Sequence, residues 1–193
     1  KFFGISKISH KWNRADRLYL KGWDTIHKIH LQHAKASDLL DKKLIEKSVW
    51  DDYFKFAFVR NPWDRAHSDY LWMMKDRKVS GSFEDYINAE GVFKPHLTNL
   101  SSRDTRADHL LPQTDFIYSK TGELLVDFVG KFENLMLDFE KVCQKANVKF
   151  EGLPHVKKST SKKVKYQDFY SDDQRELVTK KYARDIELLG YEF

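Results

Sequence analysis

The stretch that decides the fold is Phe56–Ser68, which reads FAFVRNPWDRAHS. Its first part completes a short, mostly apolar and aromatic run over 54–59, which is typical of a buried strand. Asn61-Pro62 then ends the strand and begins a helix, because asparagine is a good N-cap and proline suits the first helical position. We expect this helix to continue to about residue 75. The stretch therefore predicts a strand, a sharp stop and a helix in immediate succession.

The patterns elsewhere in the chain alternate between helix and strand. We expect helical structure after His33 and over 83–89, an irregular segment over 90–113, strands over 115–118 and 124–129, a helix from Glu133, and a final helix between Ser171 and Gly190. Ser171 and Gln174 have the spacing of a capping box, and Gly190 suits the residue that follows a helix. Strands that alternate with helices predict an α/β layered domain with a mainly parallel sheet.

Length and composition predict one globular domain over residues 1–193. Apolar residues make up 41% of the chain and charged residues 33%, so the chain can bury a core and does not resemble a disordered one. No apolar run approaches the roughly 18 residues of a membrane-spanning helix, and the start does not resemble a signal peptide. Because the first residue is Lys1 and not methionine, we expect either processing at this point or further sequence upstream.

The single cysteine, Cys143, excludes an internal disulfide and any zinc site built from several cysteines. It lies on a helical apolar stripe in LDFEKVCQKANV, and we interpret it as a core residue and not as a catalytic thiol. A fold that needs no disulfide favours a cytoplasmic location.

Positive charge gathers in one segment. The chain has 34 Lys and Arg against 29 Asp and Glu, a net charge of +5, which favours an anionic ligand. Residues 155–166, HVKKSTSKKVKY, hold five lysines and no acid. Two interpretations stay open for this segment: a solvated loop, or a flap that grips phosphate.

Arg60 is the main candidate for an anion site. It follows the predicted strand, and ligands of α/β sheets collect outside the carboxyl ends of the strands. The start of the next helix attracts anions through its free N–H groups, and a guanidinium matches phosphate. Arg65 and Ser68, three positions apart, share a face of that helix. The competing interpretation is a simple ion pair between Arg60 and Asp64.

These residues resemble a known family. FVRNPWDRAHSDY (58–70) is similar to the 3′-phosphate-binding element of sulfotransferases that use 3′-phosphoadenosine 5′-phosphosulfate (PAPS), and most similar to family 2, which includes the carbohydrate sulfotransferases. Four further blocks agree in order: LQHAKASDLL, HLLPQTDFIYSKTGELLVDFVGKFENL, LPHVKKST and YSDDQRELVTKKYARDIELLGYEF. The resemblance covers roughly residues 30–193 and implies a three-layer, P-loop-like α/β fold.

The resemblance implies roles for particular residues. Arg60 and Ser68 would bind the 3′-phosphate of PAPS, and His33 would be the catalytic base. The basic segment would close over the adenosine and the 3′-phosphate, with contacts from Lys158, Ser159, Thr160, Lys162 and Lys163. The irregular segment would lie near the acceptor, and its candidates for binding the acceptor are Arg103, Arg106 and His109. The alternative interpretation is that these three are simply exposed loop residues.

One element of the family is missing from this chain. Family members begin with a strand and a loop close to Pro-Lys-Thr-Gly-Gly-Thr-Ser, whose amides and lysine bind the 5′-phosphosulfate. The only glycines in residues 1–31 are Gly4 and Gly22, and neither is followed by the Lys-Ser/Thr of such a loop. We therefore expect an N-terminally incomplete domain, or the loss of half of the donor site.

Three functions compete. The first is a sulfotransferase that moves a sulfuryl group from PAPS to a hydroxyl of a glycan or another hydroxylated acceptor. The second is a catalytically impaired module of the same fold that binds the nucleotide or a sulfated ligand. The third, a basic nucleic-acid-binding domain, is disfavoured because basic and aromatic residues are not interleaved and no recognised motif is present.

Sulfuryl transfer resembles phosphoryl transfer, in which the protein mainly positions the reactants and balances charge. A histidine suits the role of base, and no metal is required. His27, His30 and His33 have a spacing that one helix would present to a zinc ion, but surface histidines with one functional base are the simpler interpretation. The family has soluble bacterial members and anchored Golgi-lumenal members, so the compartment stays open. The sequence does not indicate the oligomeric state.

Overall fold

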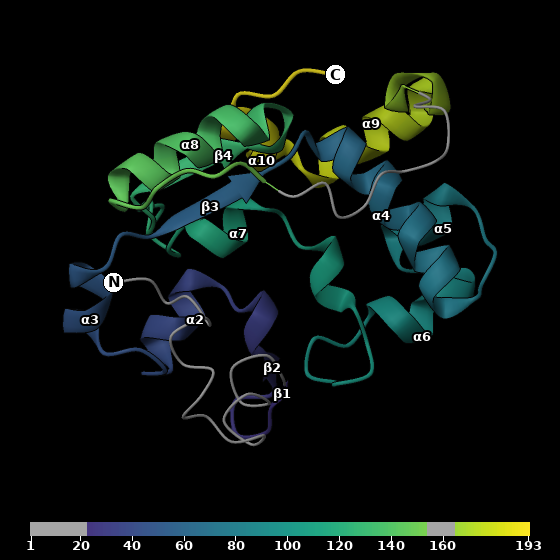
Figure 1. Ribbon diagram of the computed structural model, residues 1–193. Coiled ribbons are helices and arrows are strands. Elements are labelled where there is room, and N and C mark those ends of the chain that lie inside the picture. Colours follow the sequence, from purple (N-terminus) through teal and green to yellow (C-terminus); the bar gives the residue numbers. More distant parts are fainter. Residues whose placement is uncertain (1–22, 154–164) are drawn as a thin grey trace.

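The computed structural model describes residues 23–153 and 165–193. At its centre, β3 (Phe56–Val59) and β4 (Phe128–Lys131) form a parallel pair, with Phe56 opposite Phe128 and Val59 opposite Lys131. The helix α8 (Leu135–Lys145) packs on β4 and covers one side of the pair (Figure 1). The fold is therefore α/β with a small parallel sheet, which confirms the predicted class.

The helix after β3 forms as the sequence predicts. It is α4 (Pro62–Arg77), and the side chain of Asn61 accepts hydrogen bonds from the backbone N–H groups of Trp63 at 3.1 Å and Asp64 at 3.3 Å. These contacts confirm the N-cap and satisfy two of the N–H groups that a helix start leaves without partners. The buried face of α4 consists of Trp63, Ala66, Tyr70 and Met73.

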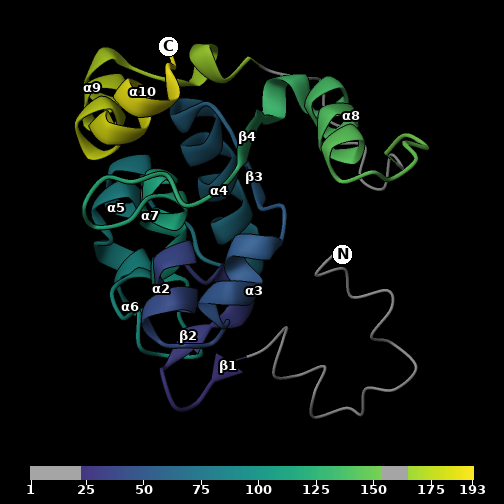
Figure 2. The same cartoon turned by 90° about the vertical axis from the view of Figure 1, so that its left-hand side faces the viewer.

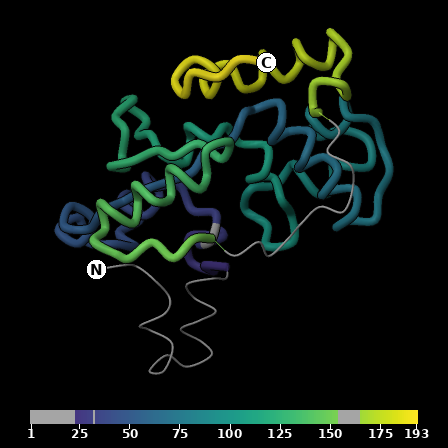
Figure 3. The backbone as a smooth tube through the Cα atoms, turned by 45° about the horizontal axis from the view of Figure 1, so that its top comes forward, coloured from purple at the N-terminus to yellow at the C-terminus, as the bar shows by residue number. Residues whose placement is uncertain are grey.

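An aromatic core joins α4 to segments from the C-terminal end of the chain. The ring of Tyr70 lies 5.5 Å from Phe83 of α5 (Phe83–Asn88) and 6.1 Å from Phe169 of η5 (Tyr166–Phe169). Next, α9 (Asp172–Lys181) packs against both α4 and α5, and Figure 3 shows the C-terminal segment in yellow beside the blue of α4. Burial of large apolar side chains contributes about 1.5–3 kcal/mol each, so this core anchors the C-terminal helices to α4.

The expected strand over 115–118 is wrong, because its first three residues belong to the short helix α7 (Thr114–Ile117). The carboxylate of Asp185 accepts hydrogen bonds from the backbone N–H groups of Gln113 at 2.7 Å and Thr114 at 2.8 Å. Such a partner for the first N–H groups of a helix favours a helical turn over an extended chain. The aspartate comes from a distant helix, so no local pattern reveals it.

Two other boundaries also differ from the expectation. Of the predicted pair of strands, one isolated antiparallel bridge forms between Tyr118 and Leu124, and β4 begins only at Phe128. The final helix is divided at Tyr182 into α9 and α10 (Ala183–Leu189). Its predicted ends are confirmed, since Ser171 and Gln174 form a capping box and Gly190 has a φ of 62°.

Short elements from two parts of the chain meet at one end of the molecule. The first part forms β1 (Trp23–Asp24), β2 (Ile29–His30), η1 (Leu31–His33), α2 (Ala36–Asp41) and α3 (Lys47–Asp52). The segment expected to be irregular contains η2 (Gly91–Phe93), α6 (Lys94–Leu97) and η3 (Ala107–Leu110). Figure 2 shows β1, β2 and α6 at the same end, so this arrangement brings η1 close to the loop around η3.

Cys143 is buried with 4% exposure, which confirms its interpretation as a core residue. None of the helices in the described residues is long and apolar enough to cross a membrane.

Candidate active site

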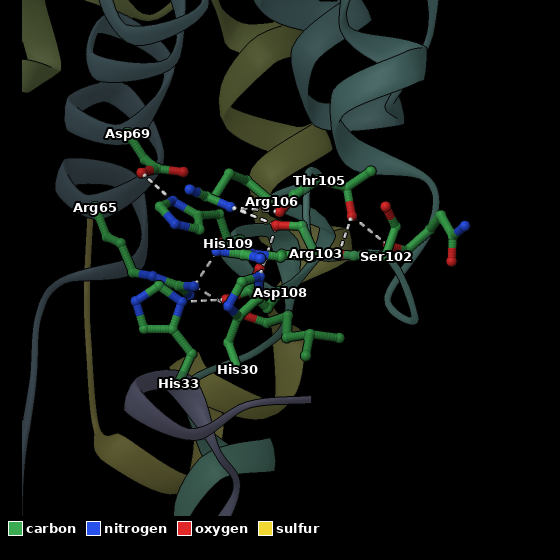
Figure 4. A network of polar contacts seen from close by, with 12 residues as sticks. His30, His33, Arg65, Asp69, Ser102, Arg103, Thr105, Arg106, Asp108 and His109 are labelled. Atoms are coloured by element: carbon green, nitrogen blue, oxygen red, sulfur yellow. Dashed lines mark hydrogen bonds and ion pairs between the residues drawn. The ribbon is translucent and has the colours of Figure 1, made fainter. Parts of the chain in front are cut away.

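His33 and Asp108 form the central pair of the site. Their side chains are joined by a hydrogen bond between Nδ1 of His33 and Oδ2 of Asp108 (Figure 4). Burial by itself would raise the pKa of Asp108, but the hydrogen bond and the charge of His33 outweigh burial and hold this pKa below its ordinary value. The carboxylate is therefore ionised at neutral pH and only accepts, so Nδ1 of His33 carries the proton. In the neutral ring, Nε2 is then free to accept a proton.

His109 lies beside this pair and has its own carboxylate. Its ring centroid is 5.4 Å from that of His33, and its Nδ1 lies 2.8 Å from Oδ1 of Asp69 on α4. The other oxygen of Asp69 accepts a hydrogen bond of 2.5 Å from the hydroxyl of the buried Tyr86. Trp72 is 40% exposed, and its ring stacks on that of His109 with the centroids 4.9 Å apart. These contacts hold the His109 ring in one orientation.

Arg65 holds the backbone of the loop that carries Asp108 and His109. Its Nη2 donates hydrogen bonds of 2.8 Å to the carbonyl oxygens of both His109 and Leu111. Its Nη1 lies 4.0 Å from Oδ2 of Asp185, which is fully buried. The positive charge of Arg65 is thus compensated by a buried aspartate, and its donors fix the position of η3.

The two histidines open into a cavity of about 290 Å³, whose lining is His33, Ala34, Arg65, Asp69, Asp108, His109 and Phe116. A larger cavity of about 520 Å³ lies elsewhere, between α3, β3 and the end of α8, and its lining is mainly apolar. Size alone would select the larger cavity, but the smaller one is lined by histidine and carboxylate side chains, the residue types that most often transfer protons in enzymes. We therefore take the 290 Å³ cavity as the candidate active site.

Arg60 follows the carboxyl end of β3, where the sequence predicts it. Its Nε donates a hydrogen bond of 2.7 Å to Asp64, so the ion pair that the sequence left open is present. Its backbone is held by Gln113, whose side chain accepts from the N–H and donates to the C=O, both at 2.8 Å. The structure gives the terminal guanidinium nitrogens no partner among the described residues. Because Asn61 caps two of the first N–H groups of α4, an anion here would depend on these nitrogens.

The other predicted residues lie in different surroundings. Ser68 is half-buried on α4, two turns beyond Arg60. Arg103 is exposed, and Arg106 turns back to donate to the carbonyl oxygen of Thr105 at 2.8 Å, so neither guanidinium lines the 290 Å³ cavity. Of the predicted acceptor-binding residues, the structure brings only His109 next to His33.

The comparison with protein families adds the decisive finding. A family model described as the sulfotransferase family matches residues 16–192. The chain belongs to the sulfotransferase family. This sulfotransferase-family chain is also 29% identical over 111 residues to an uncharacterized protein of Archaeoglobus fulgidus, a match that covers 57% of the chain and 77% of that protein. No solved structure matches the chain.

Several of the predicted contacts between this sulfotransferase-family chain and PAPS remain predictions. The candidates of the basic segment lie outside the described residues: Lys158, Ser159, Thr160, Lys162 and Lys163. The predicted roles of Arg60 and Ser68 likewise rest on the family resemblance.

The sequence did not reveal which carboxylates bind His33 and His109 in this sulfotransferase-family chain. Asp108 is adjacent to His109 in the chain, and Asp69 lies one turn after Arg65 on α4, but neither spacing indicates which histidine each carboxylate binds. The alternative zinc site is not formed by the histidines expected for it, since His27 pairs with Asp24 at 2.7 Å and His30 contacts the carbonyl oxygen of Arg103.

Proposed function

We propose that this protein transfers a sulfuryl group from PAPS to a hydroxyl of a glycan or another hydroxylated acceptor. The observation that carries the proposal is the pair of His33 and Asp108 at the edge of an open cavity, in a chain of the sulfotransferase family. A histidine whose Nδ1 is held by an ionised carboxylate has the tautomer and the orientation of a general base.

In the proposed reaction, Nε2 of His33 takes the proton of the acceptor hydroxyl. The acceptor oxygen forms a bond to sulfur while the bond between sulfur and the 5′-phosphate oxygen breaks. The electron pair of that bond leaves with 3′-phosphoadenosine 5′-phosphate. Asp108 stabilises the imidazolium that forms, because its carboxylate lies at the opposite nitrogen of the ring. A base of this kind contributes about 10²–10⁴-fold to the rate.

The donor would bind along the N-terminal half of α4. The 3′-phosphate would accept hydrogen bonds from the terminal nitrogens of Arg60 and from the hydroxyl of Ser68. The position of Arg60 supports this role, since the ion pair with Asp64 and the ring of Phe132, 4.8 Å away, hold the guanidinium at the end of β3. The basic segment would then cover the nucleotide.

The acceptor would enter the cavity beside His109. Trp72 supports a carbohydrate acceptor, because this partly exposed indole stacks on His109, the neighbour of the base, and its other face offers an apolar surface for a sugar ring. The exposed Arg103 would meet an acidic group of a larger acceptor outside the cavity.

The donor site is tested by the thermal stability of the protein with 3′-phosphoadenosine 5′-phosphate. A ligand at 100 times its Kd adds about 2.7 kcal/mol, which for this chain length corresponds to a Tm increase of about 5–11 °C. Arg60→Ala should abolish the increase, while Lys75→Ala, which removes an exposed cation farther along the same helix, should keep it. An equal increase in Arg60→Ala would remove Arg60 from the site.

The reaction is tested by transfer of labelled sulfate from PAPS to carbohydrate acceptors. His33→Ala should keep the nucleotide-induced Tm increase and lose turnover by about 10²–10⁴-fold, while His30→Ala, the neighbouring histidine, should keep turnover. Nucleotide binding without any transfer would favour the impaired binding module. Salt-sensitive binding to arbitrary DNA without a nucleotide effect would favour the nucleic-acid-binding domain.

A further inference from the structure

The cluster at the cavity has a second chemical capacity. One ligand atom each from His33, Asp108 and His109 lie within 4.8 Å of one another, and among the described residues these three form the one group with metal-ligand geometry. Two imidazoles and one carboxylate are a typical protein ligand set for zinc with an open fourth position. They come from two short segments, η1 and η3, and Arg65 holds the backbone of η3.

The groups around the cluster resemble the support that metal-binding histidines receive. Asp69 holds Nδ1 of His109 at 2.8 Å, so Nε2 is the nitrogen that His109 offers to a ligand. A carboxylate on the far nitrogen is the usual outer partner of a metal-bound histidine, because it fixes the tautomer and raises the basicity of the ring. The hydroxyl of Tyr86 donates a hydrogen bond to the other oxygen of Asp69, and Trp72 stacks on the His109 ring and fixes its plane.

The charge of the surroundings also favours a cation. Asp108 within the cluster and Asp69 beside it contribute two carboxylates. The nearby guanidinium of Arg65 is compensated by Asp185, and its Nη2 is engaged by the carbonyl oxygens of the loop. The adjoining cavity of about 290 Å³ leaves room for a water molecule as the fourth ligand.

We propose that His33, Asp108 and His109 bind one Zn²⁺ ion, which replaces the proton that Nδ1 of His33 shares with Asp108, with Asp69 as the outer partner of His109. Nitrogen ligands select zinc, cobalt or nickel over magnesium and calcium. The metal and the proposed proton transfer use the same histidine, so Zn²⁺ is an inhibitor of the reaction and not its cofactor. This inhibitory consequence rests on the proposed function, whereas the binding itself does not.

Binding is tested on the purified full chain, without donor or acceptor, by titration with Co²⁺ and by calorimetry with Zn²⁺. Co²⁺ should produce the visible absorption bands of a four-coordinate site with a stoichiometry of one. His109→Ala and Asp108→Asn should abolish this site, and Asp69→Asn should weaken it by about 10–100-fold. His30→Ala is the matched control, a neighbouring histidine outside the ligand set, and should keep the site unchanged.

Equal Co²⁺ spectra and Zn²⁺ affinities in the wild type, His109→Ala and Asp108→Asn would overturn the proposal. Circular dichroism and Tm without metal identify a variant that fails to fold, and His33→Ala then serves as the third ligand variant. A chelator separates this proposal from the proposed function. Sulfuryl transfer in EDTA without a Zn²⁺ site contradicts only the metal proposal, whereas a Zn²⁺ site without transfer in EDTA contradicts only the enzyme proposal.

Discussion

Asp185 and Thr114 are joined by two hydrogen bonds, because Oδ1 of Asp185 accepts from both the backbone N–H at 2.8 Å and the hydroxyl at 2.7 Å of Thr114. Both residues are fully buried, and the other oxygen of Asp185 accepts from the backbone N–H of Gln113 and faces Arg65. The C-terminal helix α10 therefore stabilises α7 and, through Arg65, the loop that carries the candidate active site.

We predict that Asp185→Ala destabilises the protein by about 3–5 kcal/mol, because it leaves two backbone donors unsatisfied and Arg65 without its buried counter-charge. Asp185→Asn should cost less, since its amide oxygen still accepts one hydrogen bond. Urea unfolding measures both. Glu187→Ala, an exposed acid on the same helix, should stay within about 0.5 kcal/mol of the wild type. Equal losses for the Asp185 and Glu187 variants would contradict the role of the buried carboxylate.

We predict that Asp108→Asn lowers kcat by about 10²–10⁴-fold while the nucleotide-induced Tm increase is retained. An amide at this position no longer stabilises the His33 imidazolium and also permits the tautomer with the proton on Nε2. The measurement is the rate of sulfate transfer at saturating donor. Asp104→Asn, an exposed acid in the same loop, is the control and should leave kcat unchanged. Indistinguishable rates for the two variants would show that Asp108 does not act on the base.

We predict that Gly130→Ala destabilises the sheet by about 1–3 kcal/mol, a Tm decrease of about 2–12 °C. A Cβ at Gly130 would lie 2.5 Å from Cε1 of Phe58 on the neighbouring strand, closer than any ordinary contact. The test is a double-mutant cycle measured by thermal unfolding. Gly130→Ala should cost less in a Phe58→Leu background, because the smaller side chain removes the clash. Additive losses would mean that the ring of Phe58 is not the obstacle.

We predict that the contribution of His67 to the stability of the folded protein falls as the pH drops below about 6.5. The rings of His67 and Phe169 stack at 4.3 Å. Burial lowers the pKa of His67 from its ordinary value of 6.5, and it outweighs the opposing charge of Asp64, with a smaller contribution in the same direction from Arg60. The unfolded chain therefore takes up the proton at higher pH than the folded one. The contribution of neutral His67 to stability is complete above pH 6.5 and is lost as the pH falls from there through the lowered pKa of the folded state.

The pH dependence is measured as the Tm of the wild type and of His67→Phe, which keeps the stacking but does not titrate. The wild type should lose more Tm than His67→Phe between pH 8 and pH 5. Parallel curves for the two proteins would contradict the lowered pKa.

Local sequence signals predicted α4 and the ends of the last helix correctly. Asn61 with Pro62, and Ser171 with Gln174, act on the backbone within three residues of themselves, so their effect is present in the sequence itself. The expected strand over 115–118 was wrong, because Asp185, about 70 positions away in the chain, accepts from the N–H groups of Gln113 and Thr114 and so stabilises a helical start just before it. Propensity alone does not report such a distant partner.

The sequence by itself determined the α/β class, the strand that leads through Arg60 into α4, and membership of the sulfotransferase family, because these depend on contiguous residues and on the order of whole blocks. Only the tertiary structure decided that His33 meets Asp108, 75 positions later, and that Asp69 and Trp72 hold His109. Side-chain pairs this far apart in the chain are selected by the packing of η1, η3 and α4 against one another. The chemistry of the candidate site is therefore a property of the fold and not of any single motif.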